Sequence, residues 1–291
     1  MNAGQAQEIA FEAGLLEKDL TRIARDRPIA HFRTKVIDDL VGGVKARLTI
    51  FSGGPGKGKS TLVHQLGDEL AAQGVKTMYF TFEMSRQDLL EKSFSRLSKG
   101  TIPVSQVPEA ASMGSDDFKK VVAAYRSSIA DNMAISAEHF TPKQISAAVK
   151  RLKRESGGND KFAVIIDYLQ IMEPDSGRGR GDDRAALKEI ISSLRTIVEK
   201  EAVPIIAISA INRSSYKKAS VDIDALAESA SLEYAADTVL FLSAGETKNN
   251  HPKDSVKRFR PMELTVLKNR YGALGSASLV FNAEFATFWE A

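Results

Sequence analysis

The sequence predicts an α/β protein with a mainly parallel, twisted sheet, helices on both faces and a C-terminal β-hairpin. Three observations support this fold class. Apolar runs at 162–167 and 203–209 have the continuous hydrophobicity of strands buried on both faces of a parallel sheet. Segments of strand and helix character alternate along most of the chain. A glycine-rich turn joins the first such strand, 48–51, to a helix that begins near 61.

The turn after the first strand fits the pattern G-x-x-x-x-G-K-[ST], in the strand–loop–helix setting of a phosphate-binding loop. Glycines let the backbone curl so that its N–H groups face an anion, and the helix N-terminus adds partial positive charge. Lys59 is expected to reach the β- and γ-phosphates, and Ser60 to hold Mg²⁺. The sequence therefore predicts a site for ATP and Mg²⁺, with Gly53, Gly54, Pro55, Gly56, Lys57, Gly58, Lys59, Ser60 and Thr61 as the nucleotide-binding residues.

Residues 1–28 are expected to form an N-terminal helical arm, and residues 29–291 a single ATPase domain. Within 5–25, apolar residues recur among charged ones at helical spacing, with an interruption near Gly14. Two interpretations of this arm stay open. It either folds back on its own domain or docks on a neighbouring subunit as a linker helix.

The remaining elements follow from hydrophobic patterns and from helix and turn signals. Thr141 and Pro142 mark a helix start, because a capping residue precedes proline at the first helical position. The stretch 100–114 contains two prolines and is expected to be a loop, and the last two strands should form a hairpin around 272–275. Helices are predicted at 61–73, 86–98, 116–131, 142–155 and 185–200, and strands at 48–51, 76–82, 133–137, 162–167, 203–209, 238–242, 263–268 and 276–281.

The composition excludes several classes of protein. The chain has 291 residues, of which 43% are hydrophobic and 26% charged, as in ordinary globular proteins. It has no cysteine, which excludes disulfides and thiolate metal sites and is compatible with the reducing cytoplasm. No apolar run indicates a membrane span, and the first residues lack a secretory signal pattern. The net charge of +3 means that any basic surface for nucleic acid must be local.

Five further motifs occur in a fixed order around the phosphate loop. They are FEMS at 82–85, IIDYLQIM at 165–172, ISAINRS at 208–214, ESASLEYAAD at 228–237 and KNRYG at 268–272. Together with the phosphate loop they resemble the C-terminal motor domain of DnaB-type replicative helicases, a RecA-like fold. The resemblance covers roughly residue 30 to the end of the chain, and several independent motifs carry it.

The resemblance implies roles for individual side chains, each with a plainer alternative. Glu83 stands where the family has the carboxylate that orients the attacking water, although an acid there would also suit a helix N-terminus. Asp167 matches the Walker B acid that holds Mg²⁺ with Ser60, although a strand-end aspartate can be a simple cap. Lys268 and Arg270, two apart on a predicted strand, match the pair that reaches a neighbour's γ-phosphate as arginine fingers. A solvated strand edge is the alternative for that pair.

Two positions depart from the family pattern. Ala210 stands where the family has a glutamine that is thought to sense the γ-phosphate and signal to the adjacent DNA-binding loop. Alanine cannot form that hydrogen bond, so nucleotide state and DNA grip are expected to be weakly coupled unless Asn212 has taken over the contact. Tyr234 also replaces a family glutamine. The family's separate N-terminal domain has no counterpart in residues 1–28.

The resemblance implies an ATP-hydrolysing motor that acts on single-stranded DNA as a ring-shaped or helical homo-oligomer, most simply a hexamer. A helicase or translocase in DNA replication or repair, working with replication or mobile-element proteins, is expected. The alternative is an ATP-dependent switch or assembly protein that does not unwind DNA, which Ala210 favours. DNA contacts are expected from basic residues in two loops that follow core strands, namely Arg178, Arg180, Arg184, Arg213, Lys217 and Lys218.

Overall fold

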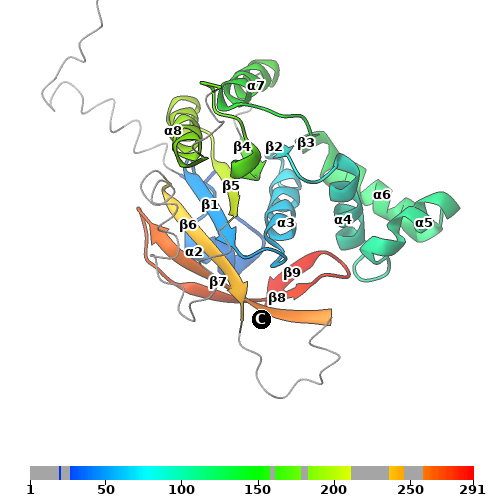
Figure 1. Cartoon of the computed structure of the whole chain (residues 1–291). Coiled ribbons are helices and arrows are strands. Elements are labelled where there is room, and N and C mark those ends of the chain that lie inside the picture. Colours follow the sequence, from blue (N-terminus) through cyan, green and yellow to red (C-terminus); the bar gives the residue numbers. More distant parts are fainter. Residues whose placement is uncertain (1–19, 21–26, 158–160, 178–182, 211–235, 246–257) are drawn as a thin grey trace, which may run out of the picture.

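The fold is built on one sheet of nine strands, in the order β3-β2-β4-β5-β1-β6-β7-β8-β9. The computed structural model describes residues 27–157, 161–177, 183–210, 236–245 and 258–291, together with residue 20. Figure 1 shows the sheet as the centre of the molecule, with helices on both sides of its parallel part. The predicted α/β fold class, with its mainly parallel sheet, is confirmed.

Six strands run parallel and carry the apolar runs seen in the sequence. All six residues of β4 are buried, and the first five residues of β5 are buried as well. This pattern arises because helices cover both faces of a parallel sheet. The strands are β1 (Leu48–Gly53), β2 (Lys76–Thr81), β3 (Met133–Ser136), β4 (Phe162–Asp167), β5 (Ile205–Ala210) and β6 (Thr238–Ala244).

Three antiparallel strands extend the sheet beyond β6. β7 (Phe259–Asn269) pairs with β6 and with β8 (Ser276–Asn282), and β8 pairs with β9 (Thr287–Glu290). The expected hairpin around 272–275 is thus confirmed as β7–β8, whereas β9 was not expected from the sequence. Figure 1 shows these strands continuing the sheet beside β6, with the C-terminus at their end.

Helices cover both faces of the sheet. On one face, α3 (Lys59–Ala71) packs Leu62, Leu66 and Leu70 on the sheet, together with Ile37 from α2 (Lys35–Val41). On the other face lie α7 (Pro142–Glu155) and α8 (Asp183–Glu201), which surround a second apolar cluster. Outside α3, the helices α4 (Arg86–Leu97), α5 (Val107–Met113) and α6 (Asp116–Ser128) form an additional layer with its own apolar contacts.

Several local expectations need correction. Residues 100–114 are not a loop, because they hold a 3₁₀ turn at Val104–Gln106 and the helix α5. Helix α2 was not expected either. The predicted start of α7 is confirmed, since Thr141 caps the helix in a capping box with Gln144 and Pro142 occupies its first turn. Most of the predicted arm, residues 1–19 and 21–26, lies outside the described residues. Among the described helices, none has the length and apolar character needed to cross a membrane.

Candidate nucleotide site

The phosphate loop forms the curl that its sequence predicts. Gly53, Gly56 and Gly58 adopt positive φ values of 143°, 70° and 88°, which side chains other than glycine rarely allow. At Gly53 an added Cβ would lie 2.3 Å from the carbonyl oxygen of Leu242, so only glycine fits this close approach to β6. The loop ends at the N-terminus of α3, where no side chain caps the helix and its first N–H groups have no partner within the helix. This is an anion-binding cradle.

Lys59 lies inside this cradle. Its ammonium donates a hydrogen bond of 2.8 Å to the carbonyl oxygen of Gly54 in the same loop. Burial lowers the pKa of Lys59, while the carboxylates of Asp167 and Glu83 act in the opposite direction. The Lys59 ammonium is therefore held where a bound phosphate would neutralise it, and the charges of Asp167 and Glu83 both act on it.

Ser60 and Asp167 meet across the edge of the sheet, although 107 positions separate them. The Ser60 hydroxyl donates to Oδ1 of Asp167 at 3.1 Å, and the Tyr79 hydroxyl donates to Oδ2 at 2.9 Å. Asp167 is fully buried, and burial raises the pKa of its carboxyl, which the two hydrogen bonds partly offset. A carboxylate and a hydroxyl are hard oxygen donors of the kind that Mg²⁺ prefers, so the residues present fit this cation.

Glu83 follows β2 at the same edge of the sheet and is exposed. It does not cap the next helix: Ser85 is the N-cap of α4 and forms a capping box with Asp88. Glu83 still lies only two residues before that cap, so an acid stabilised by the dipole of α4 remains the alternative to a catalytic role. The Glu83 charge adds to the effect of burial in raising the pKa of Asp167, so its carboxylate lies within electrostatic range of the cation site.

Lys268 and Arg270 lie at the opposite edge of the sheet. Lys268 pairs with Val239 at the start of β6, and the Arg270 amide donates to the Asp237 carbonyl just before it. Gly53 pairs with Leu242, which lies five residues beyond Asp237 and three beyond Val239. At about 3.3 Å per residue, the Arg270 backbone is therefore about 17 Å, and the Lys268 backbone about 10 Å, from the level of Gly53. Arg270 also lies in the turn after β7, so the expectation that both residues sit on one strand is wrong for it.

Comparisons with known proteins agree with this geometry. A sequence model of the DnaB-like helicase C-terminal domain family matches residues 31–290. The chain belongs to this family. Two relatives carrying the name replicative DNA helicase DnaB, from Pasteurella multocida and Geobacillus stearothermophilus, are 27% identical over 248 residues and 28% identical over 257 residues. These matches cover 83% and 87% of this chain but 50% and 54% of the relatives, so the chain spans about half the length of the curated relatives it matches.

Solved structures show the same fold. One of them, described as an ATPase domain, matches with a TM-score of 0.79 at 20% identity, covering 98% of this chain and 100% of that one. A DnaB-like replicative helicase, described with its interactions with primase, matches with a TM-score of 0.78 at 19% identity. That match covers 98% of this chain and 68% of the other. The RecA-like architecture expected from the motifs is therefore established for this DnaB-like chain.

Most of the predicted DNA contacts fall outside the described residues. This applies to Arg178 and Arg180 in one loop and to the three residues predicted in the other, Arg213, Lys217 and Lys218, as well as to Asn212 and Tyr234. Arg184 is described and lies exposed in the first turn of α8. Both loops begin at the edge of the sheet that carries the phosphate loop, because β4 and β5 run parallel to β1 and end there.

Ala210 ends β5 beside Gln170, a contact that the sequence did not suggest. The Gln170 amide donates to the carbonyl oxygen of Ala210 and to the hydroxyl of Ser209, both at 2.8 Å. Its side-chain oxygen accepts from the Ala210 N–H at 3.1 Å. A glutamine from the DYLQ motif thus holds the backbone at Ala210, and links the segment after β4 to the end of β5.

Two more site residues escaped the sequence reasoning. Tyr79 contacts Asp167, as described above. Lys92 extends from α4 to within 3.4 Å of the Thr61 hydroxyl and 3.2 Å of the Met84 sulfur. Burial lowers the pKa of Lys92, and the carboxylates of Asp167, Asp88 and Glu83 oppose that effect. Neither residue belongs to a recognisable motif, so only the paired strands and the helix packing reveal them.

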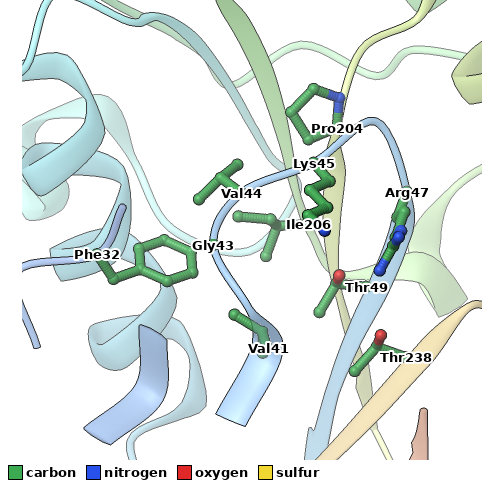
Figure 2. Close-up of a pocket in the computed structure, with 10 residues that line it drawn as sticks. All are labelled: Phe32, Val41, Gly43, Val44, Lys45, Arg47, Thr49, Pro204, Ile206 and Thr238. Atoms are coloured by element: carbon green, nitrogen blue, oxygen red, sulfur yellow. The ribbon is translucent and has the colours of Figure 1, made fainter. Parts of the chain in front are cut away.

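A small pocket lies at the far edge of the sheet, away from the phosphate loop. Figure 2 shows apolar side chains, among them Phe32 and Val41, on one side of it and Arg47 with two threonines on the other. The Arg47 guanidinium lies 4.0 Å from the centroid of the Tyr271 ring, next to Arg270. The pocket therefore borders the turn that carries the candidate finger and is not the nucleotide site.

Proposed function

We propose that this chain is an ATP-hydrolysing motor that acts on single-stranded DNA as a homo-oligomer, in the manner of a replicative helicase or translocase. One observation supports the nucleotide chemistry most directly, which is the contact between Ser60 of the phosphate loop and Asp167 at the end of β4. Only the fold brings these two oxygen donors together, and Lys59 lies beside them. Membership of the DnaB-like family adds the expectation of DNA as the partner.

Each residue then has a defined task. The loop N–H groups and Lys59 bind the phosphates, and the buried position of Lys59 strengthens that attraction because solvent screens it less. Ser60 and Asp167 would hold Mg²⁺, which supplies charge neutralisation at the β- and γ-phosphates when bound. Glu83, exposed at the same edge and not used as a helix cap, orients the attacking water and accepts its proton.

The position of Arg270 supports an oligomer. The Arg270 backbone lies about 17 Å from the level of its own phosphate loop, which is farther than its side chain reaches, so it cannot touch a γ-phosphate bound there. In a ring or helical filament, the edge of one subunit that carries Arg270 meets the phosphate-loop edge of the next subunit. Arg270 then completes the neighbour's site, with Lys268 beside it. A hexamer is the assembly we propose, and replication or mobile-element proteins are its proposed partners.

DNA contacts are assigned to the loops that follow β4 and β5, through Arg178, Arg180, Arg184, Arg213, Lys217 and Lys218. Contacts of this kind neutralise phosphates and carry no sequence preference. Both loops start beside the nucleotide site, and Gln170 ties their two strands together. We propose that this contact couples nucleotide state to DNA binding in place of a side chain at Ala210.

The test is a titration of ATP hydrolysis with single-stranded DNA, run with Mg²⁺ and accompanied by mass measurement with and without nucleotide. We expect Mg²⁺-dependent hydrolysis that DNA stimulates, an assembly larger than a monomer, and no hydrolysis by Lys59→Ala. A DNA response that stays flat while hydrolysis and assembly persist would support the alternative, an ATP-dependent switch. Absence of hydrolysis in the parent protein would contradict both functions.

A further inference from the structure

Tyr79 lies behind the candidate cation site and has a direct contact with it. The residue belongs to β2, its side chain is fully buried, and its hydroxyl donates to Oδ2 of Asp167 at 2.9 Å. The contact follows from the strand register. Thr81 pairs with Asp167 in the parallel β2–β4 ladder, and Tyr79, two residues before Thr81, therefore faces the same side of the sheet as Asp167. The α3 helix that carries Ser60 covers that side of the sheet.

The two oxygens of Asp167 thereby have separate partners. Oδ1 accepts from Ser60 in the phosphate loop, and Oδ2 accepts from Tyr79 in the core. The last torsion of an aspartate side chain is broad and roughly two-fold, so one hydrogen bond alone leaves the carboxylate plane poorly defined. A second, buried donor defines it, and Oδ1 then stays directed toward Ser60.

The ring of Tyr79 is itself held in place. The His64 ring packs edge-on against it, with centroids 5.5 Å apart and planes at 89°. Arg96 is a donor only, so the Nδ1 atom of His64, 3.0 Å from its Nη2, accepts and Nε2 carries the proton. Arg96 also binds Asp68 at 2.6 Å and donates to the Ala286 carbonyl at 2.7 Å. The ring of His64 is thus held by a buried group of residues from α3, α4 and the β8–β9 turn.

We propose that Tyr79 is a positioning residue of the Mg²⁺ site: its hydroxyl fixes Oδ2 of Asp167, so that Oδ1 and the Ser60 hydroxyl face the cation. The inference rests on the proposed function. Groups that hydrogen-bond to a metal ligand from behind fix its orientation, and their removal typically costs about 10- to 100-fold in metal affinity or activity. A tyrosine that only filled the core would have no such effect.

Tyr79→Phe isolates the hydroxyl, because it keeps the ring and its contact with His64. Tyr125→Phe is the matched control, since Tyr125 is also buried but packs on Phe94 in the outer helical layer, away from Asp167. Two readouts are needed. The first is Mn²⁺ binding to the ADP-loaded protein, followed by electron paramagnetic resonance, and the second is the Mg²⁺ concentration that half-activates hydrolysis.

We expect Tyr79→Phe to weaken Mn²⁺ binding by about 10-fold or more and to raise the half-activating Mg²⁺ concentration similarly. ADP binding without metal should stay at the parent level, and Tyr125→Phe should match the parent throughout. Placing 4-aminophenylalanine at position 79 restores a donor and should restore Mn²⁺ affinity. If Tyr79→Phe does not fold, 4-fluorophenylalanine at position 79 fills the same space without a donor and replaces it in the comparison. Weaker Mn²⁺ binding by the fluoro variant than by the amino variant supports the proposal, and equal binding contradicts it.

The proposal and the function on which it rests fail differently. Parental Mn²⁺ binding by a folded Tyr79→Phe variant, alongside normal metal-dependent nucleotide binding in the parent, would overturn the role of Tyr79 and leave the nucleotide site intact. Failure of the parent to bind Mn²⁺ with ADP would remove the proposed function and this inference together.

Discussion

Arg270→Ala tests whether the catalytic site is shared between subunits. Because Arg270 lies at the sheet edge opposite its own phosphate loop, about 17 Å from the level of Gly53, its loss should leave nucleotide binding by a monomer unchanged. Turnover in the oligomer should fall by about 10³- to 10⁵-fold, the range for an arginine that stabilises the transferring phosphoryl group. The measurements are nucleotide binding by dilute protein and steady-state hydrolysis by the assembled protein.

A mixture of the Arg270→Ala and Lys59→Ala variants shows whether Arg270 acts on the neighbouring subunit or within its own. A subunit with Arg270→Ala keeps an intact phosphate loop, and a subunit with Lys59→Ala keeps an intact finger. In a random equal mixture, about a quarter of the interfaces combine an intact loop with an intact finger, so hydrolysis should recover to about a quarter of the parent rate if sites act independently. Mixed assemblies that form but show no recovery at any ratio would refute action in trans.

Three further substitutions test other parts of the site. Glu83→Gln should bind ATP nearly as the parent does and hydrolyse it at least about 100-fold more slowly, whereas parental turnover would exclude Glu83 as the base. Burial lowers the pKa of His64 from 6.5 to about 3, so between these values only the unfolded chain takes up the proton and stability is lost as pH falls. The free energy of unfolding falls by about 2 kcal/mol by pH 5 for this reason. The His64→Gln variant should lose less stability between pH 7 and pH 5, as measured by urea unfolding at both pH values. An equal loss in the variant and the parent would contradict this prediction. Ala210→Gln should raise the ratio of DNA-stimulated to basal hydrolysis by about 5-fold or more, and an unchanged ratio would place the coupling elsewhere.

Local hydrophobic patterns were sufficient to predict the parallel part of the sheet. The run at 162–167 forms β4 with the predicted bounds, because a strand covered by helices on both faces needs apolar side chains at every position. The phosphate loop was equally predictable, since its glycines are required by backbone geometry at single positions such as Gly53. These features depend on short stretches of chain, which a sequence displays directly.

Features that depend on context were missed. Helix α5 lies in the stretch 100–114, which was expected to be a loop and contains two prolines. One of them, Pro108, lies in the first turn of α5, where proline is well tolerated. Strand β9 is only four residues long, and its pairing with β8 comes from register, not from pattern. Tyr79 and Gln170 acquire their roles from residues 88 and 40 positions away, across neighbouring strands. No spacing rule connects such residues before the sheet order is known.

The central claim, an ATP-driven motor on single-stranded DNA, is tested most directly by strand displacement from a forked DNA duplex with single-stranded tails of both polarities. We predict that the parent protein releases the labelled strand with ATP and Mg²⁺, and that ADP, or the Lys59→Ala variant with ATP, releases none. DNA-stimulated hydrolysis without strand release, on forks carrying either tail, would contradict unwinding and leave an ATP-dependent assembly switch as the function.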